Sequence, residues 1–181
     1  MSELLIGCGS NRDKRLKDPL HDEGWVDLTT LDNNLDHDPD VFWDLRGTPW
    51  PFPDDEFDEV HAYEVLEHLG QQGDYKALFS QFSEVWRVLK PDGKLYATVP
   101  WWQSNWAWGD PSHTRVIQPE TLVFLDQKQY TEQVGVTPMS DFRYLYKADL
   151  STVNAWRVGD TFCFILRAIK PSRLSYDRPT G

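Results

Sequence analysis

Glycines and carboxylates stand where the apolar runs of this chain end. Leu4-Leu5-Ile6 leads directly into Gly7-Cys8-Gly9, and Asp32 follows about 20 residues later. A glycine turn lets a ligand approach the backbone, because no Cβ stands in the way and a positive φ is allowed. An acidic side chain at this distance is the usual partner of a ribose. Together these residues point to a cofactor that contains adenosine.

Further carboxylates follow the next two strand-like runs. Asp44 comes after Val41-Phe42-Trp43, and Glu64 and Glu67 come after the run 57–60. In open α/β sheets, ligands bind beyond the carboxyl ends of the strands, where the strand order reverses. We therefore expect the glycine turn and these carboxylates to share one site.

The elements that must position this site alternate between strands and helices. A long amphipathic helix is capped by Asp74 and ends at the turn Pro91-Asp92-Gly93, whereas residues 12–20 are a short helix or a loop. Further helical segments are 65–69 and 121–133, and strands are expected from residue 3 and over 28–32, 41–44, 57–63, 94–99, 142–148 and 161–169. This order predicts an α/β fold: a Rossmann-like, seven-stranded, mostly parallel sheet with an antiparallel last strand.

Length and composition predict a single domain over residues 1–170, followed by a polar tail over 171–181. The net charge of −11 disfavours duplex DNA and bulk RNA, because nucleic-acid binders carry a basic face. Cys8 and Cys163 lie in apolar runs and are expected to be buried thiols without a disulfide, which fits a reducing compartment. With no membrane span or signal peptide expected, the sequence predicts a cytoplasmic protein.

The most unusual segment is the aromatic loop 100–118, which we expect to form a lid or a substrate loop. Its four indole rings could stack on substrate, form a contact between two copies, or pack into the core. His113 and Asp110 are candidate bases, and His68 in the short helix is a third; each could instead be a structural group. The substrate-facing candidates of this segment are Trp101, Trp102, Trp106, Trp108 and Arg115.

Several other site types are not indicated by the sequence. Five histidines and two cysteines are scattered without Cys-x-x-Cys or His-x-x-x-His spacing, so no metal site is expected. A Walker phosphate loop is missing. Ala62-Tyr63-Glu64-Val65 stands where amino-methylating DNA enzymes carry Asn/Asp-Pro-Pro-Tyr. Gly9 is followed by Ser10 rather than by the spacing of a Gly-x-Gly-x-x-Gly turn, which disfavours a nicotinamide oxidoreductase.

Six pieces in order resemble the class I S-adenosylmethionine-dependent methyltransferases, in the branch often called type 11. They cover about residues 3–100, over half of the chain. The most specific are the runs Val65-Leu66-Glu67-His68-Leu69 and Val88-Leu89-Lys90-Pro91-Asp92-Gly93. The others are 5–9, 31–32, 44–45 and 51–58.

The resemblance implies roles for single residues toward S-adenosyl-L-methionine. The backbone of Gly7, Cys8 and Gly9 would hold the methionine part, and Asp32 would bind the ribose hydroxyls. The remaining contacts would be Asp44 and Leu45 at the adenine, Tyr63 and Glu64 beside the sulfonium, and Asn11 or Arg12 at the carboxylate.

The resemblance also implies a methyltransferase whose acceptor is unidentified and expected to be a small molecule. Two alternatives stay open: a catalytically silent S-adenosylmethionine-binding partner subunit, or a tRNA or protein methyltransferase. Relatives often carry covering helices before the first strand, so the aromatic loop or a second subunit would have to close this site. Similar short sequences occur in bacteria and phages, which leaves a viral origin and a host-cytoplasmic location open.

Overall fold

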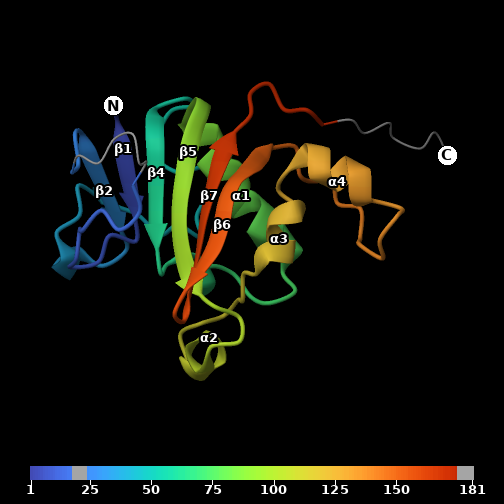
Figure 1. The fold of residues 1–181 in the computed structure, drawn as a ribbon. Helices are drawn as coiled ribbons and strands as arrows, with labels where there is room; N and C mark the ends of the chain where they lie inside the picture. The colour runs from blue at the N-terminus through green and yellow to red at the C-terminus, as the bar shows by residue number, and fades with distance from the viewer. Residues whose placement is uncertain (18–23, 175–181) are drawn as a thin grey trace.

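The computed structural model describes residues 1–17 and 24–174, and seven strands of this part form one sheet in the order β3-β2-β1-β4-β5-β7-β6 (Figure 1). The first five strands are mutually parallel, and β7 is antiparallel to both of its neighbours. This confirms the predicted mostly parallel sheet with an antiparallel last strand. The strands are β1 Glu3–Ile6, β2 Leu28–Asp32, β3 Val41–Phe42, β4 Phe57–Tyr63, β5 Leu89–Pro100, β6 Leu150–Val158 and β7 Thr161–Ala168.

The carboxyl ends of the parallel strands meet at the lower edge of the sheet in Figure 1, where α2 (Asn105–Gly109) lies. The remaining helical elements are η1 Leu35–His37, η2 Leu66–His68, α1 Tyr75–Val88, α3 Pro119–Val123 and α4 Gln127–Gln133. Each strand end at this edge is followed by a turn or a short 3₁₀ segment, so the backbone there stays open to a ligand.

The main core lies between the sheet and α1. Leu4, Ile6 and Val60 point from the sheet toward Phe82 and Val85 of the helix, and all are buried. The helix begins where the Asp74 carboxylate accepts a hydrogen bond from the Ala77 N–H at 3.0 Å, as predicted. Alternate residues of β1 and β4 face the other side of the sheet, so both faces of these central strands are covered.

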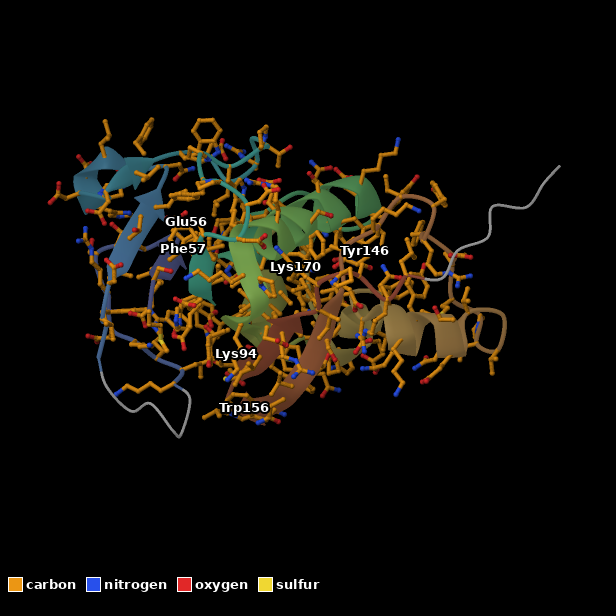
Figure 2. All side chains as sticks on the ribbon, turned by 90° about the horizontal axis from the view of Figure 1, so that it is seen from above. Glu56, Phe57, Lys94, Tyr146, Trp156 and Lys170 are labelled. Carbon is orange, nitrogen blue, oxygen red and sulfur yellow. The ribbon has the colours of Figure 1, made fainter. Side chains whose placement is uncertain are left out.

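The predicted turn at Pro91-Asp92-Gly93 lies inside a strand. β5 starts at Leu89, directly after α1, and its pairing with β4 shifts register between Phe57 and Glu59. Asp92 has φ +63°, so the turn residues form a bulge and the strand continues. Figure 2 shows the molecule from above and labels Glu56 and Lys170, which contact the chain at the start of β5. Glu56 donates its N–H to Val88 O at 2.9 Å, and Lys170 Nζ donates to Leu89 O at 2.6 Å.

The carboxyl-terminal third differs most from the prediction. The helix expected over 121–133 is two helices, because the Asp126 carboxylate accepts from the Lys128 and Gln129 N–H groups and caps a new start. The strand expected over 142–148 is wrong. Tyr146 donates its N–H to Phe142 O at 2.9 Å, a helical turn that brings both rings against Phe79, where Tyr146 stacks and Phe142 is tilted (Figure 2 labels Tyr146 beside α1).

The strand before β7 is instead β6, and the hairpin turn between them is Gly159-Asp160. β6 is an edge strand with Val153 and Val158 exposed, so its sequence lacks the apolar alternation of a half-buried strand.

Smaller predictions have mixed outcomes. The described residues 11–17 form no helix, and the remainder of the expected 12–20 segment lies outside the described residues.

Residues 175–181 of the predicted tail also lie outside the described residues. The start of the tail is anchored to the domain, because Arg173 Nε lies 2.7 Å from Asp149 Oδ2. Cys8 and Cys163 are buried free thiols, as expected. Within the described part of the chain, no helix has the length and apolar character to cross a membrane.

Candidate functional site

The glycine turn after β1 is held against the end of β2. Gly7 and Gly9 have φ +57° and +56°, a region that other residues enter only with strain. A Cβ on Gly7 would lie 2.3 Å from Val65 Cγ2, so only glycine fits there. A Cβ on Gly9 would meet nothing within 4 Å, which leaves the backbone of the turn accessible from that side.

Asp32 is the buried acceptor of this region. Its Oδ2 accepts the Gly9 N–H at 2.9 Å, its Oδ1 accepts the Asn34 N–H at 2.8 Å, and His37 Nδ1 lies 3.2 Å from Oδ2. Burial acts to raise the pKa of Asp32, but the two N–H groups and His37 outweigh it and hold the pKa below its ordinary value. The carboxylate is therefore charged at neutral pH and has lone pairs left for a further donor.

A cavity of about 410 Å³ opens between the glycine turn and the strand ends. Asp44 lies on its wall with a bidentate ion pair to Arg46, whose Nη2 is 2.7 Å from Asp44 Oδ2. The side chain of Leu45 is buried beneath it. The lining residues are Gly7, Gly9, Asp32, Asn33, His37, Trp43, Asp44, Leu45, Arg46, Glu64, Val65, His68, Leu69 and Ser112.

A second cavity of about 270 Å³ adjoins the first across the glycine turn. Gly7, Gly9 and Glu64 line both cavities, so the turn and the end of β4 stand between them. Glu64 has φ +56°, a strained conformation for a residue with a side chain, directly after β4. The remaining lining residues are Leu5, Cys8, Ser10, Asn11, Arg15 and Tyr63.

These cavities gather nearly all of the predicted cofactor residues at the sheet edge. Arg12 is the exception, because its guanidinium donates to His37 O at 2.8 Å and to Asp38 O and so braces the loop after β2. The sequence analysis missed His37, Trp43 and Ser112 in the cavity wall. Trp43 directly precedes the predicted Asp44, and His37 belongs to the short turn after Asp32; this proximity was the available signal.

A buried ionic network holds the loop that follows the glycine turn. The Lys14 side chain packs against one face of the sheet, where it pairs with Glu3 and its Nζ lies 2.9 Å from Glu59 Oε2. His61 Nε2 lies 3.0 Å from the same Glu59 oxygen, and its Nδ1 lies 2.6 Å from Tyr63 Oη. Burial acts to raise the pKa of Glu59, yet His61 and Lys14 lower it to about 2. This network fixes the Tyr63 ring behind the second cavity.

A third group of polar side chains lies beside the first cavity. Glu67 and His68 of η2 meet His113 of the aromatic loop: each histidine Nε2 is 3.9 Å from Glu67 Oε1. Asp110 Oδ2 is 3.9 Å from His113 Nε2. The predicted bases His68, Asp110 and His113 are therefore brought together, and Glu67, one of the carboxylates expected at this edge, lies beside both histidines.

The residues predicted to face the substrate do not lie together in the structure. Trp101 packs on Phe162, whereas Trp106 and Trp108 on α2 are 66% and 68% exposed. Arg115 is buried, donates to Gln71 O at 3.0 Å and Asp74 O at 2.8 Å, and holds the start of α1. The four indoles and Arg115 do not belong to the described lining of either cavity beside the glycine turn.

A family model and a curated protein each match part of this chain. A model of the methyltransferase domain matches residues 24–97. The sterol 24-C-methyltransferase of Pneumocystis carinii is 35% identical over 68 residues, which are 37% of this chain and 16% of that protein. The chain thus matches less than a fifth of the length of this curated relative.

Two solved structures share the fold. The putative methyltransferase bound to the Trm112 methyltransferase activator in a Haloferax volcanii complex has a TM-score of 0.60 at 13% identity, over 93% of this chain and 82% of that one. The N-methyltransferase NodS of Bradyrhizobium japonicum, in complex with S-adenosyl-l-homocysteine, has a TM-score of 0.53 at 18% identity, over 92% and 77%. The family model matches residues 24–97, and the chain shares the fold of S-adenosylmethionine-dependent methyltransferases.

Proposed function

We propose that this chain transfers the methyl group of S-adenosylmethionine to an acceptor that enters beside η2 and the aromatic loop. The observation that carries the proposal is the cavity at the ends of β1, β2 and β4, with the buried Asp32 on one side of the glycine turn and Glu64 on the other. Its volume lies within the usual range of small-molecule sites, about 300 to 1,000 Å³. When bound, the cofactor supplies an electrophilic methyl group on a sulfonium.

The residues around the cavity suit the parts of this cofactor. Asp32 has free lone pairs for the two ribose hydroxyls, and the backbone of Gly7 and Gly9 admits the methionine part without a Cβ in the way. Asp44 and Leu45 form the wall for the adenine. Cys8, Asn11 and Tyr63 line the adjoining cavity, where the amino-acid end of the cofactor would extend.

The acceptor would approach from the side of His68 and His113, because His68 and Ser112 line the cavity there. Methyl transfer requires in-line approach and positioning above all. We favour a small-molecule acceptor, because the net charge of −11 opposes binding of a long polyanion. A tRNA or a protein side chain is the alternative acceptor.

The test is methyl transfer from tritiated S-adenosylmethionine to separate pools of small hydroxy and amine compounds, total tRNA, duplex DNA and protein. We expect label in a small-molecule pool, and its loss in the His113→Ala variant. Label in tRNA alone, with binding that weakens steeply as salt rises, would contradict the small-molecule acceptor. Full activity of His113→Ala on the true acceptor would remove His113 from the reaction.

A second candidate function is that of a partner subunit that binds the cofactor without catalysis. The exposed Trp106 and Trp108 favour it, since large exposed aromatic rings are enriched at protein interfaces. The Haloferax volcanii neighbour was solved with an activator subunit. Light scattering of the purified chain distinguishes the cases: a monomer that methylates an acceptor alone excludes this second function.

A further inference from the structure

We propose that Glu67, His68 and His113 bind one divalent first-row metal cation at the acceptor end of the cofactor cavity. Three ligand atoms, one from each residue, all lie within 4.8 Å of one another. They come from η2 and from the loop after α2, and this pairing is fixed by the backbone: Thr114 and Arg115 donate their N–H groups to Glu67 O at 2.9 and 3.1 Å. The two segments therefore hold the cluster together independently of any ion.

The two imidazoles are oriented as metal ligands are. His68 Nδ1 lies 3.0 Å from Ser112 O, and His113 Nδ1 lies 2.9 Å from Trp106 O. A carbonyl oxygen only accepts, so each Nδ1 carries the proton, and in the neutral ring Nε2 keeps its lone pair. A backbone carbonyl on the second ring nitrogen is the usual way in which proteins orient a metal-binding histidine. Both Nε2 atoms face Glu67.

The carboxylate at the centre is buried and lacks a compensating partner. Glu67 is 2% exposed, and neither of its oxygens has a hydrogen-bond partner within residues 1–17 and 24–174. Both Nε2 distances, at 3.9 Å, are too long for hydrogen bonds. The carboxylates of Glu64 and Asp110 also act on Glu67 through repulsion. A buried carboxylate among further carboxylates needs a compensating positive charge or a proton.

A second acidic cluster of this chain shows the contrast. Glu3, Glu59 and His61 also place three ligand atoms together in a buried position. There, the Lys14 ammonium pairs with both carboxylates, so the protein already supplies a cation. Among the described residues, no lysine or arginine pairs with Glu67. Of the two clusters, only the one at Glu67 has a buried carboxylate with no cation from the described part of the chain beside it.

The donor set indicates the class of cation. Two imidazole nitrogens with a carboxylate oxygen suit manganese, iron, cobalt or zinc better than calcium. Three protein ligands leave coordination positions open for water or for an acceptor oxygen. Because His68 also lines the cofactor cavity, the inference deepens the proposed function, on which it rests for the acceptor: the nucleophile would be an oxygen held on the cation.

The test uses the full chain, stripped with EDTA and titrated with MnCl₂ while electron paramagnetic resonance reports free Mn²⁺. We expect one saturable Mn²⁺ per chain and at least tenfold weaker binding in Glu67→Gln and in His113→Asn. The matched control is His37→Asn, a histidine of the same cavity outside the cluster, which should bind Mn²⁺ as the wild type does. Circular dichroism establishes that each variant is folded, and the rise in Tm of the wild type with Mn²⁺ gives a readout that needs no variant.

Two results would overturn the metal site. One is Mn²⁺ binding that is unchanged in a folded Glu67→Gln or His113→Asn chain. The other is a wild-type chain that neither binds Mn²⁺ nor gains thermal stability from it, which would leave a proton shared between Glu64 and Glu67 as the compensation. Calorimetry with S-adenosylhomocysteine on the same samples separates the proposals: cofactor binding without Mn²⁺ binding rejects the metal alone, and the reverse rejects the cofactor site alone.

Discussion

Asp32 has two tasks at one position: it anchors the glycine turn through the Gly9 N–H and presents a charged carboxylate to the cavity. The Asn34 N–H holds its other oxygen, so the side chain is oriented before any ligand arrives. Such preorganisation lowers the entropy cost of binding. It also means that a substitution here affects the turn as well as the ligand.

We predict that Asp32→Ala weakens binding of S-adenosylhomocysteine by about 1.5 to 3 kcal/mol, the scale of hydrogen bonds to a charged group. Asp32→Asn should lose less, because its amide oxygen still accepts a hydrogen bond. The measurement is calorimetric titration of folded variants. Asp40→Ala is the matched control, since Asp40 binds Thr30 on the same strand and lies outside the cavity lining. Equal affinity of Asp32→Ala and wild type would exclude Asp32 as the ribose ligand.

At the scale of elements, buried ion pairs of Lys14 anchor the loop after the glycine turn to the sheet. Residues 11–17 form no helix, yet Lys14 from this loop is inserted between Glu3 and Glu59 under β1 and β4. The loop in turn supplies Asn11 and Arg15 to the second cavity. The network thus couples the stability of the sheet to the shape of the site.

We predict that Lys14→Met lowers the free energy of unfolding by about 3 to 5 kcal/mol, because it leaves two buried carboxylates without their cation. Urea denaturation measures the change. Lys76→Met, at an exposed position on α1, is the control and should stay within about 0.5 kcal/mol of wild type. A Lys14→Met chain as stable as the control would show that the buried pair contributes nothing net.

The same network predicts how stability depends on pH. The folded pKa of Glu59 is about 2, below the ordinary 4.5. A carboxyl group whose pKa is lower in the folded than in the unfolded chain stabilises the fold at pH values above its unfolded pKa. This contribution is lost as pH falls from about 4.5 toward 2. Glu59→Gln should therefore flatten the stability profile in this window, measured by urea denaturation at successive pH values. If the stability of Glu59→Gln fell with acid pH as steeply as that of the wild type, Glu59 would not be the group responsible.

The elements that the sequence predicted well are those with a clear local signal. β2 and β4 have the predicted bounds, because buried runs with flanking turn residues are unambiguous. The segment 142–148 failed, because Phe142 and Tyr146 are inward at a spacing of one helical turn and their rings fill the space beside Phe79. β6 was missed because an exposed edge strand does not need alternating apolar residues.

For the whole molecule, the sheet topology explains why part of the site was predictable. Gly7, Asp32, Asp44 and Glu64 each lie at or just after the end of a parallel strand, and parallel strand ends meet at one edge (Figure 1). The cluster of Glu67 with His113 was not predictable in this way. Its members come from η2 and from an irregular loop far along the chain, and their ligand spacing exists only after folding.

The central claim concerns the ligand of the cavity at the glycine turn. The most direct measurement is calorimetric titration of the purified full chain with S-adenosylhomocysteine and, separately, with NADH. The account predicts one S-adenosylhomocysteine per chain and no comparable binding of NADH, because residues 10–17 after the glycine turn form no helix, whereas a dinucleotide site opens a long helix there. Tighter binding of NADH, or a folded chain that binds no S-adenosylhomocysteine, would contradict it.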